Sequence, residues 1–156
     1  MEDILGAELI KKDLTAQPTA AALEGKDFVG LYFGAHWAPC CRRFTTTLME
    51  KYPEINANGN KFEVVFVSKD GNQDAFDRNF GNEMNWLAIK YDDEARKKSL
   101  EQKFSIMEIP MLIILDKSGH QVSQSGINDL QNNQPGEILE YWEKMKEEQS
   151  AMADGQ

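Results

Sequence analysis

The chain of 156 residues contains two cysteines, and they are neighbours, Cys40 and Cys41. Dithiol–disulfide exchange needs one thiolate that attacks and a second thiol that resolves the mixed disulfide. The resolving thiol must follow the attacking thiol by three residues, because one helical turn then brings the two sulfurs together. Position 38, three residues before Cys41, is alanine, and position 37, three residues before Cys40, is tryptophan. The sequence therefore contains no Cys-X-X-Cys pair.

The two neighbouring cysteines are also poorly spaced for a disulfide with each other. Adjacent α-carbons lie about 3.8 Å apart across a trans peptide, whereas unstrained disulfides prefer a separation of about 4.4–6.8 Å. We therefore expect no stable bond between Cys40 and Cys41, and any thiol chemistry of this chain would involve one sulfur at a time.

The two thiols are expected to differ. Cys41 falls on the apolar face of a predicted helix with Phe44 and Leu48, which favours a buried core cysteine. Cys40 lies in the first turn of that helix with Arg43 three residues on, and both features favour a thiolate. The alternative for Cys40 is an exposed cysteine without a role.

The cysteines must be positioned by the elements around them. Apolar runs at residues 28–33, 62–67 and 111–115 predict strands buried on both faces. Apolar spacing predicts helices at residues 18–23, 41–52, 72–80, 93–104 and 135–147, and a turn at 116–119 predicts a hairpin into 121–123. This order predicts an α/β fold with a central mixed sheet sandwiched by helices. The cysteines follow the first buried strand, where such sheets present their working groups.

Length and composition narrow the possible classes of protein. We expect one domain over residues 1–147 and a flexible tail over residues 148–156. The net charge of −9 disfavours nucleic-acid binding. We expect no membrane partner, because no apolar run approaches the roughly 20 residues of a membrane-spanning helix. The start of the chain predicts no secretory signal, so we expect a cytoplasmic protein.

The ligands for a metal or a cofactor are not evident in the sequence. Two histidines, His36 and His120, and two adjacent cysteines do not give the spaced ligand pairs of a zinc site. A glycine-rich phosphate loop and a serine–histidine–acid pattern are also missing. We therefore expect no cofactor and no metal.

Four separated segments carry a family resemblance. They are Trp-Ala-Pro-Cys-Cys-Arg at 37–42, Phe-Glu-Val-Val-Phe-Val-Ser at 62–68, Asn-Trp-Leu-Ala-Ile at 85–89 and Ile-Pro-Met-Leu at 109–112. Over about residues 5–145 the chain resembles the tryparedoxin and nucleoredoxin branch of the thioredoxin superfamily. The resemblance implies a thioredoxin fold with a four- or five-stranded sheet. Members of that branch carry Trp-Cys-Pro-Pro-Cys-Arg, so Ala38 stands at the first cysteine, Cys40 at the second proline and Cys41 at the resolving cysteine.

The resemblance also implies a place for a partner. It implies a cis peptide at Ile109-Pro110, facing the loop of the two cysteines, where related proteins hold an extended chain by strand-like pairing. The expected partner-binding residues are Trp37, Pro39, Ile109 and Pro110. For Trp37, a role as a packing aromatic remains an equal alternative.

Two functions remain open. The first is a protein-binding or structural module with a degenerate redox site and no dithiol–disulfide oxidoreductase activity. The second is a monothiol redox protein in which Cys40 forms a mixed disulfide with glutathione or a protein partner. Cys40 and Cys41 are the only candidate catalytic thiols. The sequence favours a protein that is not an enzyme. If it is one, the resemblance implies a thiol–disulfide oxidoreductase of the thioredoxin class.

Overall fold

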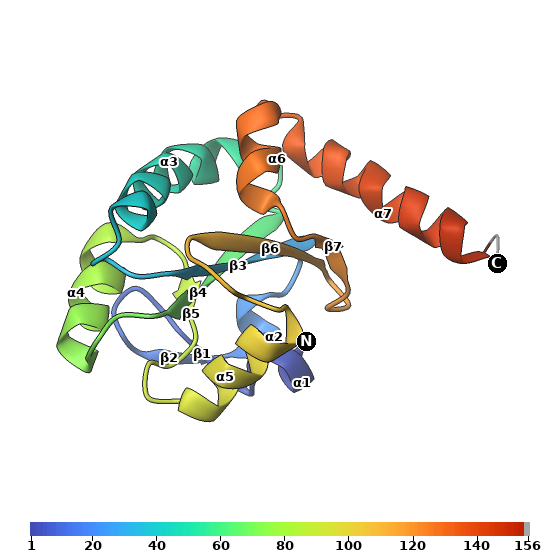
Figure 1. Ribbon diagram of the computed structural model, residues 1–156. Coiled ribbons are helices and arrows are strands. Elements are labelled where there is room, and N and C mark those ends of the chain that lie inside the picture. The colour runs from blue at the N-terminus through green and yellow to red at the C-terminus, as the bar shows by residue number, and fades with distance from the viewer. Residues whose placement is uncertain (155–156) are drawn as a thin grey trace.

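A computed structural model describes residues 1–154 and contains one mixed sheet of seven strands in the order β2-β1-β5-β4-β3-β6-β7 (Figure 1). The strands are β1 (Glu8–Ile10), β2 (Ala16–Pro18), β3 (Phe28–Gly34), β4 (Phe62–Ser68), β5 (Leu87–Ala88), β6 (Met111–Asp116) and β7 (Gln121–Ser123). The helices are α1 (Glu2–Leu5), α2 (Thr19–Ala22), α3 (Pro39–Ile55), α4 (Gln73–Glu83), α5 (Glu94–Lys103), α6 (Gly126–Asn132) and α7 (Ile138–Asp154). The predicted α/β class, with helices on both faces of a mixed sheet, is confirmed.

The central strands are buried on both faces because the helices form two layers. Strand β3 pairs parallel with β4 and antiparallel with β6. Its side chains at Phe28 and Tyr32 join the core under α3, α4 and α7. The alternate side chains at Val29, Leu31 and Phe33 join a second core under α1 and α5. Because successive side chains of a strand point to opposite faces of the sheet, β3 contributes to both cores. Strand β3 also leads directly into the segment that carries the cysteines.

The sheet is wider than the four or five strands that the resemblance implied, and that expectation was wrong. The added strands β1, β2 and β5 have only two or three residues each. Strand β1 pairs antiparallel with β2 and meets β5 through Ile10 and Ala88. Such short strands have no room for a repeating apolar pattern, and they form because the neighbouring chain supplies hydrogen-bond partners. Helix α6 has only seven residues, which is also too short to show a repeating apolar pattern, and it was not predicted.

The last helix is longer than predicted. Its helical backbone runs from Ile138 to Asp154, so the predicted helix end at Glu147 was wrong. Most of residues 148–154 are good helix formers, and the side-chain amide of Gln149 donates to the Val122 carbonyl at 2.8 Å. Positions 155 and 156 of the predicted tail lie outside the described residues. Figure 1 shows the end of α7 extending beyond the sheet.

Helix α7 is anchored to the sheet through Trp142. The indole is fully buried, and its ring lies 5.7 Å from that of Phe28 and 5.2 Å from that of Phe62, measured between centroids. Its Nε1 donates to Asp129 Oδ2 at 3.0 Å and so joins α7 to α6. Over residues 1–154, none of the helices has the combination of length and apolar character that crossing a bilayer requires.

We predict that Trp142→Ala lowers the free energy of unfolding by about 3–5 kcal/mol, because it leaves a cavity between α7 and the sheet. Glu143→Ala changes an exposed neighbour on the same helix and should stay within about 0.5 kcal/mol of the wild type. Urea denaturation of both variants measures the two effects. Equal effects would contradict the packing of α7 described above.

Candidate functional site

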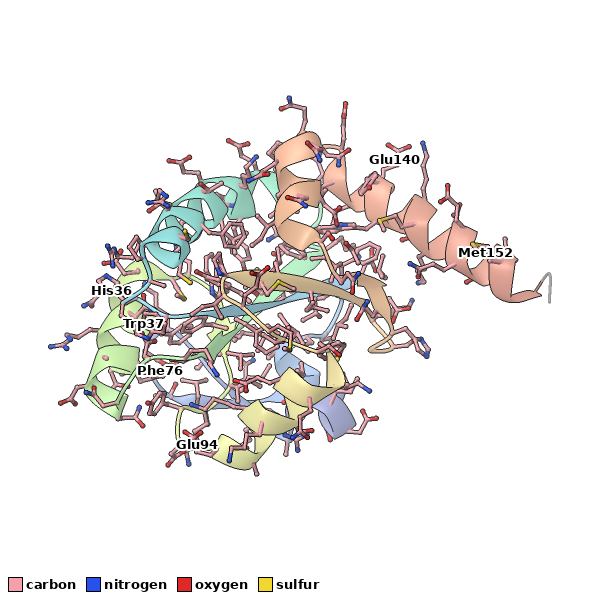
Figure 2. All side chains as sticks on the ribbon, in the orientation of Figure 1. His36, Trp37, Phe76, Glu94, Glu140 and Met152 are labelled. Carbon is pink, nitrogen blue, oxygen red and sulfur yellow. The ribbon has the colours of Figure 1, made fainter. Side chains whose placement is uncertain are left out.

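The two cysteines lie in the first turn of α3, immediately beyond the end of β3. Ala38 is the N-cap residue, with an extended backbone at φ −93° and ψ 118°, and Pro39 opens the helix. Proline suits this position because the first helical N–H has no partner within the helix. His36 and Trp37 occupy the turn between β3 and α3 (Figure 2). Alanine therefore occupies the helix-start position at which the dipole would lower a thiol pKa.

The two thiols lie in opposite environments, and both are free in the described part of the chain. Cys40 is exposed, whereas Cys41 is 1% exposed and packs in the core. Burial raises the pKa of the Cys41 thiol above its ordinary value. The prediction of Cys41 as a buried core cysteine is confirmed, and Cys41 is a poor nucleophile in the folded chain.

Cys40 has a cationic neighbour. Arg43 Nη2 donates to Cys40 Sγ at 3.3 Å, and both side chains lie at the surface. The three-residue spacing in the helix predicted this contact. A guanidinium beside a sulfur stabilises the negative charge of a thiolate through a charge-assisted hydrogen bond.

A buried hydroxyl pair fixes the start of α3 against β3. Tyr32 Oη donates to the Cys41 carbonyl at 3.0 Å and shares a 2.7 Å hydrogen bond with Thr45 Oγ1. Burial raises the pKa of Tyr32 far above its ordinary value, so the phenol remains a donor. Gly34 is required here, because a Cβ at that position would lie 2.8 Å from the Tyr32 ring.

Asp70, which the sequence did not single out, holds the other side of the loop. This carboxylate is buried just after β4, and three donors converge on it. Its Oδ1 accepts from the His36 backbone N–H at 2.9 Å, and its Oδ2 accepts from Ser68 Oγ at 2.6 Å and from Asn79 Nδ2 at 3.3 Å. The loop before the cysteines is thereby fastened to both β4 and α4.

The segment 68–70 is held by its carbonyl oxygens as well. Three side chains from different parts of the chain donate to its three successive carbonyls: Lys97 Nζ to Ser68 at 3.5 Å, Trp37 Nε1 to Lys69 at 3.0 Å and Tyr91 Oη to Asp70 at 2.6 Å. The Trp37 indole therefore has a fixed direction although it is 64% exposed. This hydrogen bond ties the exposed indole to the Lys69 carbonyl. The two roles expected for Trp37, binding a partner and packing, stay predictions.

A groove of about 270 Å³ opens beside Cys40. Its lining includes Cys40, Arg43, Phe44, Lys51, Pro110 and Ile127. The peptide bond between Ile109 and Pro110 is cis. A second groove of about 350 Å³ adjoins the first, because both are lined by Pro110 and Ile127. The structure therefore brings Cys40 and Pro110 together, whereas Trp37, Pro39 and Ile109 lie outside the lining of both grooves.

Two further residues of the site were not singled out from the sequence. Lys51 lines the groove three helical turns after Cys40, and Ile127 enters it from α6. Neither residue stands in a sequence pattern that would mark it as part of a site, because only the packing of α6 against α3 brings the two residues together. Within residues 1–154, the structure brings together no group of three or more His, Cys, Asp or Glu side chains that would hold a metal ion.

The fold and the site define a class of protein. The family model for thioredoxin-like domains matches residues 25–121, and this chain belongs to the thioredoxin-like family. Tryparedoxin I from Crithidia fasciculata is 32% identical, and its structure superimposes with a TM-score of 0.77 over 87% of this chain and 93% of that chain. A thioredoxin structure from Wuchereria bancrofti gives 33% identity and a TM-score of 0.74, over 89% and 95% of the two chains.

Within that family the chain falls in the branch of the tryparedoxins and nucleoredoxins. The nucleoredoxin of Danio rerio is 45% identical over 114 residues, which are 73% of this chain and 27% of that protein. The nucleoredoxin of Homo sapiens is 42% identical over 115 residues, or 74% of this chain and 26% of that protein. The chain spans about a quarter of the length of the curated relatives it matches.

We predict that Asp70→Ala destabilises the fold by about 2–4 kcal/mol, because it leaves several buried donors without an acceptor. The His36 amide should also exchange with solvent faster than in the wild type. Asp92→Ala removes an exposed carboxylate and should change stability by less than about 0.5 kcal/mol. Urea denaturation and amide hydrogen exchange measure the two effects, and an unchanged His36 amide would contradict the role given to Asp70.

Proposed function

We propose that this chain is a protein-binding thioredoxin-like domain without dithiol–disulfide oxidoreductase activity. The observation that carries the proposal is the placement of the sulfurs. Alanine occupies the N-cap of α3, one residue of the first turn carries an exposed thiol, and the next residue carries a buried one. The exposed and the buried sulfur are one residue apart rather than one turn apart.

Dithiol exchange has two requirements, and this arrangement meets only the first of them. The attacking sulfur must reach a disulfide in solution, and the resolving sulfur must then reach the attacking sulfur. Cys40 meets the first requirement through its exposure. Cys41 lies in the core, and successive residues of a helix point about 100° apart, so the second requirement is not met.

The two grooves beside Cys40 offer a surface for binding a partner. The two adjoining grooves run past Pro110 and Ile127 beside the start of α3. The hydrogen bonds of Asp70 and Tyr32 keep the loop and the helix start in place without any contribution from a second thiol. A protein that has lost the reaction can therefore keep the shape that receives an extended segment.

We predict that the chain reduces insulin in the presence of dithiothreitol no faster than dithiothreitol alone. Ala38→Cys restores the one-turn spacing to Cys41 and should raise the rate by at least about tenfold. The double variant Ala38→Cys/Cys41→Ser has the same attacking thiol without a resolving one and should stay at the background rate. Wild-type turnover equal to that of an ordinary thioredoxin would overturn the proposal.

A second candidate is a monothiol redox protein, favoured by the contact between Arg43 and Cys40. In this reaction the Cys40 thiolate attacks one sulfur of glutathione disulfide. A mixed disulfide forms between Cys40 and one glutathione, and the other glutathione leaves as a thiolate that takes up a proton. The reaction needs only the exposed sulfur and leaves Cys41 unchanged.

We predict that glutathione disulfide forms one adduct on the native chain, located at Cys40 by mass spectrometry. Cys40→Ser should abolish the adduct and Cys41→Ser should preserve it, because Cys41 is buried and its pKa is raised. Arg43→Gln should slow the reaction several-fold by removing the charge beside the sulfur. If Cys40 reacts no faster than a cysteine in an unstructured peptide, the monothiol candidate is excluded.

A further inference from the structure

We infer that the two adjoining grooves bind an extended segment of a partner protein that places one carboxylate against Arg43 and another against Lys51. The inference rests on the proposed binding function and adds the chemistry of the partner. It concerns the wall of the first groove formed by α3, the apolar residues Pro110 and Ile127 that line both grooves, and Glu108 in the second groove.

The α3 wall of the groove is positive on an acidic protein. The chain has 26 acidic residues and a net charge of −9, yet the described lining of the first groove contains no aspartate or glutamate. Arg43 and Lys51 both line this wall. The start of the 17-residue helix α3 adds the positive end of a helix dipole on the same side. The groove is thus a positive site within a surface of opposite charge, and such complementarity selects partners and directs their approach.

Both cations keep donors for a ligand. Arg43 donates to Cys40 Sγ, and Lys51 Nζ donates to the Leu130 carbonyl at 3.0 Å. A guanidinium has five N–H donors and an ammonium three, so these contacts leave most of their donors unused. Among the described residues, no carboxylate pairs with either cation within 4.0 Å. Arg43 and Lys51 lie about 12 Å apart along α3, so two carboxylates of the partner would each meet one cation without displacing an existing ion pair.

The apolar lining and the second groove define the rest of the occupant. Phe44 and Leu130 join Pro110 and Ile127 to give the middle an apolar lining, which suits an aliphatic or aromatic side chain. The second groove continues to Glu108, which is exposed, and to Gln124. The two grooves therefore carry opposite charges. A segment that fills both grooves would have carboxylates in the first groove, an apolar side chain at Pro110 and Ile127, and a hydrogen-bond donor in the second groove.

The test uses a random dodecapeptide library displayed on phage and the full chain as bait. We expect the enriched peptides to contain aspartate and glutamate at least about twice as often as the starting library. Arg43→Glu/Lys51→Glu should lose this preference and enrich lysine and arginine instead, a gain that misfolding cannot produce. Arg78→Glu/Lys117→Glu changes the net charge equally at exposed positions outside both grooves and should keep the acidic preference.

The outcomes separate this inference from the proposed function. Peptides that bind without acidic preference, and whose binding is lost in Ile127→Asp, would overturn the inference and leave a binding groove. Peptides that are unaffected by Ile127→Asp, or no enrichment at all, would overturn both. For the most enriched peptide, fluorescence anisotropy should give at least about a tenfold weaker affinity for Arg43→Glu/Lys51→Glu, and the affinity for the wild type should fall as salt is raised.

Discussion

The site depends on one buried carboxylate. Asp70 receives the His36 amide, the Ser68 hydroxyl and the Asn79 side chain, which come from the loop before α3, from β4 and from α4. A buried charge is tolerated only where hydrogen bonds replace the water it has lost. The hydrogen bonds that satisfy Asp70 hold the loop before α3, strand β4 and helix α4 together at one point. This carboxylate holds the loop that leads into α3, while the Tyr32 and Thr45 hydroxyls hold the helix start that carries both thiols.

Once the start of α3 is fixed, helical geometry decides what each sulfur can do. Adjacent residues of a helix point in different directions, so Cys41 enters the core beside Phe44 while Cys40 faces the groove. The same geometry places Arg43 against Cys40. The chain has the framework of the thioredoxin-like family, and on that framework one sulfur is exposed and the next is buried.

The parts of the structure that could be predicted from the sequence are those determined by local patterns. Continuous apolar runs located the three long strands, and helical periodicity placed Cys41 inside and Cys40 outside. Asp70 could not be identified in this way, because one of its partners, His36, is 34 residues away and the motif Ser-Lys-Asp-Gly resembles an ordinary turn. Lys51 and Ile127 likewise acquire their place in the groove only when α6 packs beside α3.

The fixed indole of Trp37 gives this protein an optical property of its own. Of its three tryptophans, Trp86 and Trp142 are buried and Trp37 is 64% exposed, tied to the Lys69 carbonyl. A water-soluble quencher would therefore reach one indole selectively, and that indole stands at the turn into α3. Its emission reports on the ordering of this turn separately from the integrity of the core, which the two buried indoles report.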